Sequence, residues 1–223
     1  MITKDGSIIR VIGPEVSDDV VREAVLDEDG HIRELPASEW RKFEWDAVVK
    51  FMHNYPVYVL PTTELLDVLD DLIEEYKTIE IGAGTGSIGR LLDIKMTDSH
   101  LQADKMIQQY YAAQGQPVIK YPPDVIKADA LTAYRRFKPE CMLGCYVTHL
   151  WREGMQGGNM FGVDFERLLP LLKRLILVGN LRTHAGNPIM ALDHTEIDLH
   201  GDLITRSDDR DLDRVFVWDN PNM

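Results

Sequence analysis

The sequence is poor in basic side chains. Its 223 residues include 24 Lys and Arg against 37 Asp and Glu, which gives a formal net charge of −13. Proteins that bind duplex nucleic acid draw much of their affinity from Lys and Arg on the phosphates. A nucleic-acid partner is therefore less favoured than a small molecule or a protein, and the composition does not predict an oligomeric state.

Cysteine is also scarce, and long apolar runs are missing. The two cysteines, Cys141 and Cys145, lie around one predicted strand, and we interpret both as reduced. No run approaches the roughly 20 apolar residues of a membrane span. The first residues also lack the apolar centre of a signal peptide. We therefore expect no membrane partner and a cytoplasmic protein.

What the sequence does have is a regular alternation of strand and helix patterns. Its 44% hydrophobic and 27% charged residues are ordinary for a globular chain, and the length suits one α/β domain with an extension. Five apolar segments separated by helical patterns predict a doubly wound, mostly parallel sheet within residues 61–223. The tail predicts further strands at 189–192, 196–199 and 214–218, the last of them antiparallel.

Residues 1–60 predict a small α+β extension or cap. Two Asp-Gly turns followed by β-favouring residues, at 5–10 and 29–33, could pair as a ribbon. From Ser38 to Phe51 the apolar residues recur at helical spacing. A further helix, capped by Thr62 or Thr63, leads into the first strand of the main domain.

The most informative segment lies at the end of that first strand. Gly82, Gly84 and Gly86 alternate with other residues directly after a buried-strand pattern. Glycine suits such a turn because it adopts unusual dihedral angles and lets a small molecule approach the backbone. The segment therefore predicts a ligand-binding loop.

Glu80, two residues before the first glycine, completes an acidic-x-Gly-x-Gly-x-Gly pattern. This pattern resembles motif I of the Rossmann-like, class I S-adenosylmethionine-dependent methyltransferases. The resemblance implies S-adenosylmethionine as cofactor, with the backbone of Gly82, Ala83, Gly84 and Gly86 against its methionine part and sugar. It also implies that Glu80 orients the loop or, through water, the cofactor amine.

Asp98 ends the second predicted strand, where a carboxylate can accept hydrogen bonds from both ribose hydroxyls. The alternative is a cap or turn residue. The helix between Gly86 and Asp98 is short, so His100 and Gln102 are possible substitutes.

Asp129 and Ala130 end the third predicted strand. In the family that the chain resembles, this position commonly directs an acidic side chain to the adenine amino group and a neighbouring N–H to the ring. The alternative for Asp129 is the N-cap of the helix that begins at Leu131.

Tyr146, Thr148 and His149 lie at the end of the fourth predicted strand, 141–147, at the edge where open α/β sheets bind reacting groups. These residues could position the acceptor, and His149 could deprotonate it or could instead be a structural histidine. His149 and His184 lack supporting metal-ligand spacing, so we assign no metal. The glycine-rich loop at 157–162 could be a lid or only a crossover connection.

The resemblance therefore implies in-line methyl transfer to an O or N nucleophile, and the charge favours a small-molecule or protein acceptor. Residues 84–89 also satisfy the G-x-G-x-x-G dinucleotide fingerprint, so a nicotinamide-dependent oxidoreductase is the first alternative. The second alternative is a non-catalytic binding or assembly module that keeps the fold.

Overall fold

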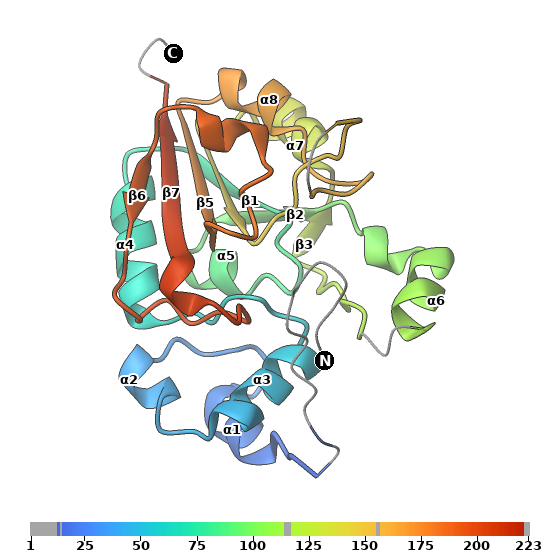
Figure 1. Cartoon of the computed structure of the whole chain (residues 1–223), viewed down its shortest axis with the longest axis vertical. Coiled ribbons are helices and arrows are strands. Elements are labelled where there is room, and N and C mark those ends of the chain that lie inside the picture. Colours follow the sequence, from blue (N-terminus) through green and yellow to red (C-terminus); the bar gives the residue numbers. More distant parts are fainter. Residues whose placement is uncertain (1–12, 14, 114–116, 155–156, 221–223) are drawn as a thin grey trace.

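A seven-stranded mixed sheet forms the centre of the protein (Figure 1). The computed structural model describes residues 13, 15–113, 117–154 and 157–220. The sheet has the strand order β3-β2-β1-β4-β5-β7-β6. Its strands are β1 Thr78–Ile81, β2 Lys95–Asp98, β3 Val125–Lys127, β4 Cys141–Cys145, β5 Arg174–Asn180, β6 Thr195–Ile197 and β7 Asp213–Asp219.

The first five strands run parallel, and β7 pairs antiparallel with both β5 and β6. This arrangement confirms the predicted α/β class, the mostly parallel sheet and the antiparallel strand near 214–218. From β1 the sheet grows in one direction through β2 and β3 and in the opposite direction through β4 and β5, so the strand order reverses at β1. In open α/β sheets such a reversal leaves a crevice at the carboxyl ends of the strands, where ligands bind.

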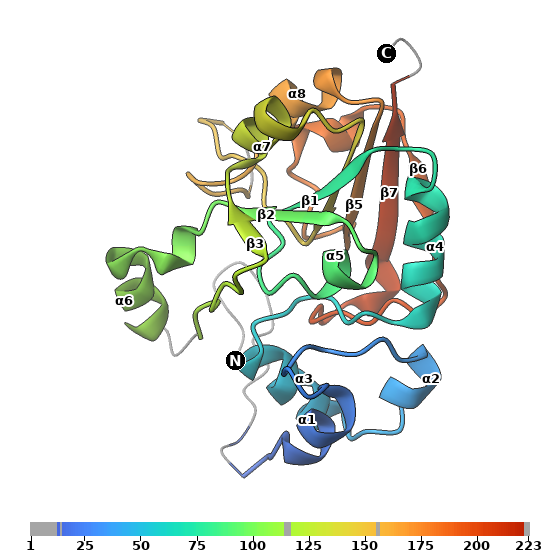
Figure 2. The same cartoon turned by 180° about the vertical axis from the view of Figure 1, so that it is seen from behind.

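Helices cover both faces of the sheet, as the opposite views in Figures 1 and 2 show. The residues of α4 and α5 pack on one face with β4, β5 and β7, and those of α7 and α8 pack on the other. The helices of the main domain are α4 Thr63–Ile73, α5 Ser87–Leu91, α6 Lys105–Ala113, α7 Ala130–Phe137 and α8 Phe165–Leu168. In the described part of the chain, no helix is both long and apolar enough to cross a membrane.

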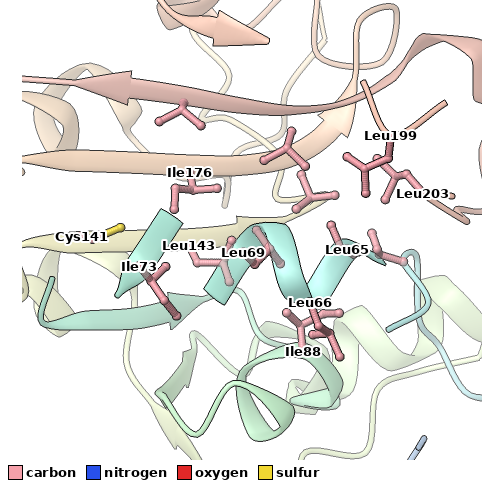
Figure 3. Packing of buried hydrophobic residues seen from close by; sticks show 14 residues of the cluster. Leu65, Leu66, Leu69, Ile73, Ile88, Cys141, Leu143, Ile176, Leu199 and Leu203 are labelled. Carbon is pink, nitrogen blue, oxygen red and sulfur yellow. The ribbon is translucent and has the colours of Figure 1, made fainter. Parts of the chain in front are cut away.

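Helix α4 covers its face of the sheet with one apolar stripe. Leu65, Leu69 and Ile73 recur at helical spacing and lie among Leu143 and Ile176 of the central strands (Figure 3). The helix begins where predicted, because the hydroxyl of Thr62 accepts a hydrogen bond from the amide of Leu65 at 3.2 Å. The stripe thus fixes the helix that precedes the glycine loop.

The N-terminal segment forms its own apolar cluster from α1 Asp19–Val25, α2 Ala37–Trp40 and α3 Trp45–Asn54. The helical pattern from Ser38 is broken between α2 and α3, so the prediction of one continuous helix was wrong. The first piece of the expected ribbon lies outside the described residues. The second piece, residues 29–33, makes only an isolated antiparallel bridge, between Leu26 and Ile32.

A short ladder joins this segment to the tail of the chain. The amide of Leu60 donates to Ile204 O at 2.9 Å, and that of Arg206 donates to Tyr58 O at 3.0 Å. The hydroxyl of Thr62 donates to Asp202 O at 2.9 Å. Residues 58–62 therefore run beside residues 202–206, although about 140 residues separate them in the sequence.

One predicted strand of the tail is a helix. Residues 188–191 form a 3-10 turn, Pro188–Ala191, and not the strand expected at 189–192. Proline suits the first position of a helical turn, and the side chain of Asn187 accepts from the amide of Ile189 at 3.4 Å. Capping chemistry therefore outweighs the β-propensity of the apolar residues.

Leu69→Ala should lower the free energy of unfolding by about 2 to 5 kcal/mol, because the side chain is fully buried and its removal leaves a cavity. Urea unfolding measures the loss. Leu192→Ala is the matched control, since Leu192 is 51% exposed. Equal losses in the two variants would contradict the packing of α4 on the sheet.

Candidate functional site

A cavity of about 540 Å³ opens at the carboxyl edge of the parallel strands. Nearly all of the residues that the sequence predicted for the site line this cavity. They are Glu80, Gly82, Ala83, Gly84, Asp98, Asp129, Ala130, Tyr146, Thr148 and His149. Gly86 is the one predicted residue outside the lining. The fold therefore brings together groups from the ends of four different strands.

The glycine loop has the left-handed backbone that its composition predicted, with φ of 61° at Gly82, 57° at Gly84 and 72° at Gly86. A Cβ at Gly82 would lie 2.8 Å from Val147 Cγ2, and one at Gly86 would lie 2.6 Å from Met96 Sδ. At Gly84 a Cβ would meet only Ile119 Cδ1, at 3.4 Å. Gly82 and Gly86 thus serve packing within the protein, whereas Gly84 leaves space on the cavity side.

Glu80 holds the far end of this loop. Its side chain is buried, and Oε2 accepts a hydrogen bond from the amide of Gly89 at 2.9 Å. A Cβ at Gly89 would lie 2.5 Å from the same oxygen, which explains the glycine there. Burial raises the pKa of Glu80 from 4.5 to about 8, with a further contribution from nearby Asp98, against the lowering effects of Gly89 and Arg90.

Asp98 holds the near end of the loop. Its Oδ2 accepts from the amide of Gly84 at 3.1 Å, and its Oδ1 accepts from the amide of His100 at 2.8 Å. Asp98 therefore both stabilises the turn and lines the cavity. A carboxylate has about four acceptor sites, so both oxygens keep capacity for a ligand hydroxyl.

An aromatic pair that the sequence did not predict lies beside Asp98. The rings of His100 and Tyr121 stack with their centroids 4.0 Å apart, and the Tyr121 hydroxyl accepts from the amide of Gln102 at 3.3 Å. Tyr121 and Gln102 line the cavity, but His100 does not. Burial, reinforced by Asp98, raises the pKa of Tyr121.

Asp129 lines the cavity but is also the N-cap of α7. Its Oδ1 accepts from the amide of Thr132 at 2.9 Å, and its Oδ2 accepts from the Thr132 hydroxyl at 2.6 Å. Burial acts to raise the pKa of Asp129, but these hydrogen bonds outweigh it and the pKa is lowered. The carboxylate is therefore ionised and fixed by the helix that it caps.

Tyr146 is locked in place by a buried network. Its backbone is left-handed, with φ of 53°, which ends β4 two residues before the predicted limit of 147. Its hydroxyl lies 2.7 Å from Oδ1 of Asp213 and 3.2 Å from the hydroxyl of Thr205. Burial and the Asp213 carboxylate raise its pKa, so Tyr146 is suited to be a rigid wall and not a base.

His149 is buried, and its Nε2 has no hydrogen-bond partner among the described residues. The glycine-rich loop packs on it closely, because a Cβ at Gly158 would lie 2.9 Å from Nε2. The fold thus leaves a buried ring nitrogen unpaired in a residue that lines the cavity. The neighbouring Thr148 is exposed, and its carbonyl accepts from the amide of Val163 at 2.8 Å.

A second histidine, His184, lines the same part of the cavity. Its Nδ1 lies 3.0 Å from the amide nitrogen and 3.1 Å from the carbonyl oxygen of Asn180, so the backbone of Asn180 holds the ring in place. Burial lowers the pKa of His184, and the proximity of His149 adds to the effect. His184 is therefore uncharged at neutral pH.

The cavity is acidic. Four acidic side chains line it, from Glu80, Asp98, Asp129 and Asp164, of which Glu80 keeps its proton at neutral pH, and none of the described lining residues is Lys or Arg. Of these, Asp164 is paired with Arg152, whose Nη2 lies 2.7 Å from it. The lining therefore favours a ligand that carries positive charge over one that carries phosphate.

Both cysteines are free thiols, and neither belongs to a metal cluster among the described residues. The ligand atoms of Asp27, Asp29 and His31 lie within 4.8 Å of one another at an exposed turn. Oδ1 of Asp27 already accepts from the amides of Asp29 and His31, which accounts for this grouping as a turn.

The structure is that of an α/β protein with a cavity at the reversal of its strand order. The chain matches none of the protein-family models compared with it, and no curated protein matches it. The fold and the cavity are therefore the basis for assigning a function.

Glu80→Gln should change how stability depends on pH. Between pH 4.5 and about 8 the folded wild type keeps a proton on Glu80 that the unfolded chain loses, so its unfolding free energy falls as pH rises. The slope contributed by this group is at most about 1.4 kcal/mol per pH unit. As the pH rises through this window, the unfolding free energy of the wild type should therefore fall relative to that of Glu80→Gln. Above the window the difference between the two should stay constant.

Urea unfolding at several pH values measures this difference. Glu75→Gln, at an exposed glutamate of the main domain, is the control and should keep the pH profile of the wild type. A difference between wild type and Glu80→Gln that stays constant from pH 5 to 8 would contradict a buried, protonated Glu80.

Proposed function

We propose that this protein is an S-adenosylmethionine-dependent methyltransferase that acts on an O or N nucleophile. The observation that carries the proposal is the glycine loop, tied at both ends to Glu80 and Asp98 and placed in an acidic cavity. The left-handed backbone and the open space at Gly84 provide a cradle that a side chain would fill.

The charge of the cavity supports this cofactor over a dinucleotide. S-adenosylmethionine carries a sulfonium and an ammonium group, which carboxylates attract, whereas a dinucleotide carries two phosphates. Phosphates are usually held by helix N-termini and basic side chains. Here the helix after the loop, α5, has only five residues, and the described lining has no Lys or Arg.

The sheet supports the same choice. The dinucleotide-binding fold has the strand order 3-2-1-4-5-6, all parallel in its two halves. Here the strand beside β5 is β7, which is antiparallel. A closing antiparallel strand is what the resemblance to the methyltransferases implied.

Each part of the cofactor has residues suited to hold it. Glu80 and the loop backbone suit the methionine end, Asp98 suits the ribose hydroxyls, and the segment around Ala130 suits the adenine. The Asp129 carboxylate is already bonded to Thr132, so it is less available to the adenine than the sequence suggested.

When bound, the cofactor would supply an electrophilic methyl group to a lone pair of the acceptor. The carbon–sulfur bond would break, and its electron pair would stay on sulfur. The task of the protein residues is to align the two partners and exclude water. His149 is our candidate to accept the acceptor proton, because it lines the cavity and its Nε2 has no hydrogen-bond partner among the described residues.

We expect S-adenosylmethionine and S-adenosylhomocysteine to bind and NADH not to bind, as measured by titration calorimetry. Gly84→Val should abolish binding, because the branched side chain would enter the space of the ligand and strain a left-handed residue. Gly30→Val is the matched control: its φ is 80°, and a Cβ there meets nothing within 4 Å. Saturable NADH binding without binding of the sulfur compounds would overturn the proposal in favour of an oxidoreductase.

Binding of S-adenosylmethionine at pH 7 should release protons. A cation beside Glu80 favours its ionised form, so its pKa should fall from about 8 as the ligand binds. Calorimetry in buffers of different ionisation enthalpy measures the release. S-adenosylhomocysteine, which lacks the sulfonium charge, should release fewer protons, and Glu80→Gln should release none from this site. Equal release by wild type and variant would contradict the placement of the cation.

A further inference from the structure

A continuous group of aromatic rings and imidazoles forms the side of the cavity beyond the glycine loop. The rings of Tyr58 and Tyr146 are nearly parallel, with centroids 6.0 Å apart. The ring of His184 meets Tyr146 edge to face at 5.4 Å, and His149 is close enough to His184 to lower its pKa. We call these four residues the aromatic wall.

The aromatic wall is held rigidly. The hydroxyl of Tyr146 is fixed by Asp213 and Thr205, and Nδ1 of His184 is fixed by the backbone of Asn180. Tyr58 belongs to the ladder between residues 58–62 and 202–206, and the guanidinium of Arg206 lies 4.6 Å from the centre of its ring. A preformed flat surface of this kind favours a flat ligand, because little entropy is lost on binding.

Within this rigid wall one buried polar atom lacks a partner. Nε2 of His149 is enclosed and has no hydrogen bond among the described residues, and the residue as a whole is 3% exposed. Leaving a buried polar atom unpaired costs free energy unless a ligand pairs with it. A ligand that hydrogen-bonds to Nε2 of His149 would remove this cost.

We propose that the aromatic wall binds the methyl acceptor, and that this acceptor is an aromatic compound without negative charge whose hydroxyl or nitrogen hydrogen-bonds to Nε2 of His149. This inference rests on the proposed methyltransferase function and names the acceptor class of the same site. As the acceptor oxygen or nitrogen forms its bond to the methyl carbon, its proton passes to Nε2, and His149 becomes an imidazolium.

Charge selects against an acidic acceptor. Asp98 and Asp129 line the cavity, and no described lining residue is Lys or Arg. Arg152 is paired with Asp164, Arg206 stacks on Tyr58, and neither arginine lines the cavity. A carboxylate or phosphate on the acceptor would be repelled and poorly solvated there, whereas an ammonium would be attracted to the carboxylates and the ring faces.

The test uses the whole protein saturated with S-adenosylhomocysteine and three phenols that differ chiefly in the charge of the side chain. They are tyrosol, which is neutral, tyramine, which is a cation, and 4-hydroxyphenylacetate, which is an anion. Ligand-observed NMR titration gives their affinities. We expect tyrosol and tyramine to bind at least tenfold more tightly than the anion. Tighter or equal binding of the anion, or binding of none of the three, would overturn the inference.

Two variants locate the binding. Tyr58→Leu should weaken tyrosol binding at least fivefold, while Tyr110→Leu, which changes a 60% exposed tyrosine of α6 outside the cavity lining, should leave it unchanged. His149→Leu should weaken tyrosol binding to a similar extent without lowering the urea midpoint, because Nε2 contributes no hydrogen bond to the fold. A lowered midpoint with unchanged tyrosol affinity would make His149 a structural residue and overturn its role here.

The two proposals fail differently. If S-adenosylhomocysteine does not bind in calorimetry, the proposed function fails and the acceptor inference fails with it. If S-adenosylhomocysteine binds and the phenol series is reversed or silent, only the acceptor class is wrong.

Discussion

Two buried carboxylates, those of Glu80 and Asp98, carry the arrangement on which the rest of the site depends. Each accepts a hydrogen bond from an amide of the glycine segment, one from Gly89 and the other from Gly84. Buried amides need such partners, because an unpaired N–H costs about 1 to 3 kcal/mol. The groups that let the turn form are therefore also acidic side chains of the cavity lining, so the folding requirement and the chemistry of the cavity are linked.

Much of the framework could be predicted from the sequence because its causes are local. Alternating strand and helix patterns predicted the parallel sheet, the alternate glycines predicted a left-handed turn, and Thr62 was expected to cap α4. Ten of the predicted site residues line one cavity because the carboxyl ends of parallel strands meet at one edge. The position of a residue at a strand end was enough to place it there.

The remainder depends on contacts between distant segments, which local patterns do not report. Tyr58 and Tyr121 come from connecting segments, and nothing in their neighbourhood in the sequence indicated a place in the wall of the cavity. The prediction of a strand at 189–192 was wrong because it ignored the capping residues before it. For Asp129 the sequence left two roles open, and the cap formed with Thr132, three residues later, is the one whose hydrogen bonds the structure shows.

The ladder between residues 58–62 and 202–206 has a consequence for how the molecule matures during synthesis. The strands β1 to β5 and the glycine turn are complete by residue 180, so this side of the cavity can form while the ribosome is still adding the tail. The segment that pairs with Tyr58 and the groups that hold the Tyr146 hydroxyl come from residues 202–213. The aromatic wall is thus finished last, and a nascent or truncated chain would have the glycine turn without the rigid ring surface opposite it.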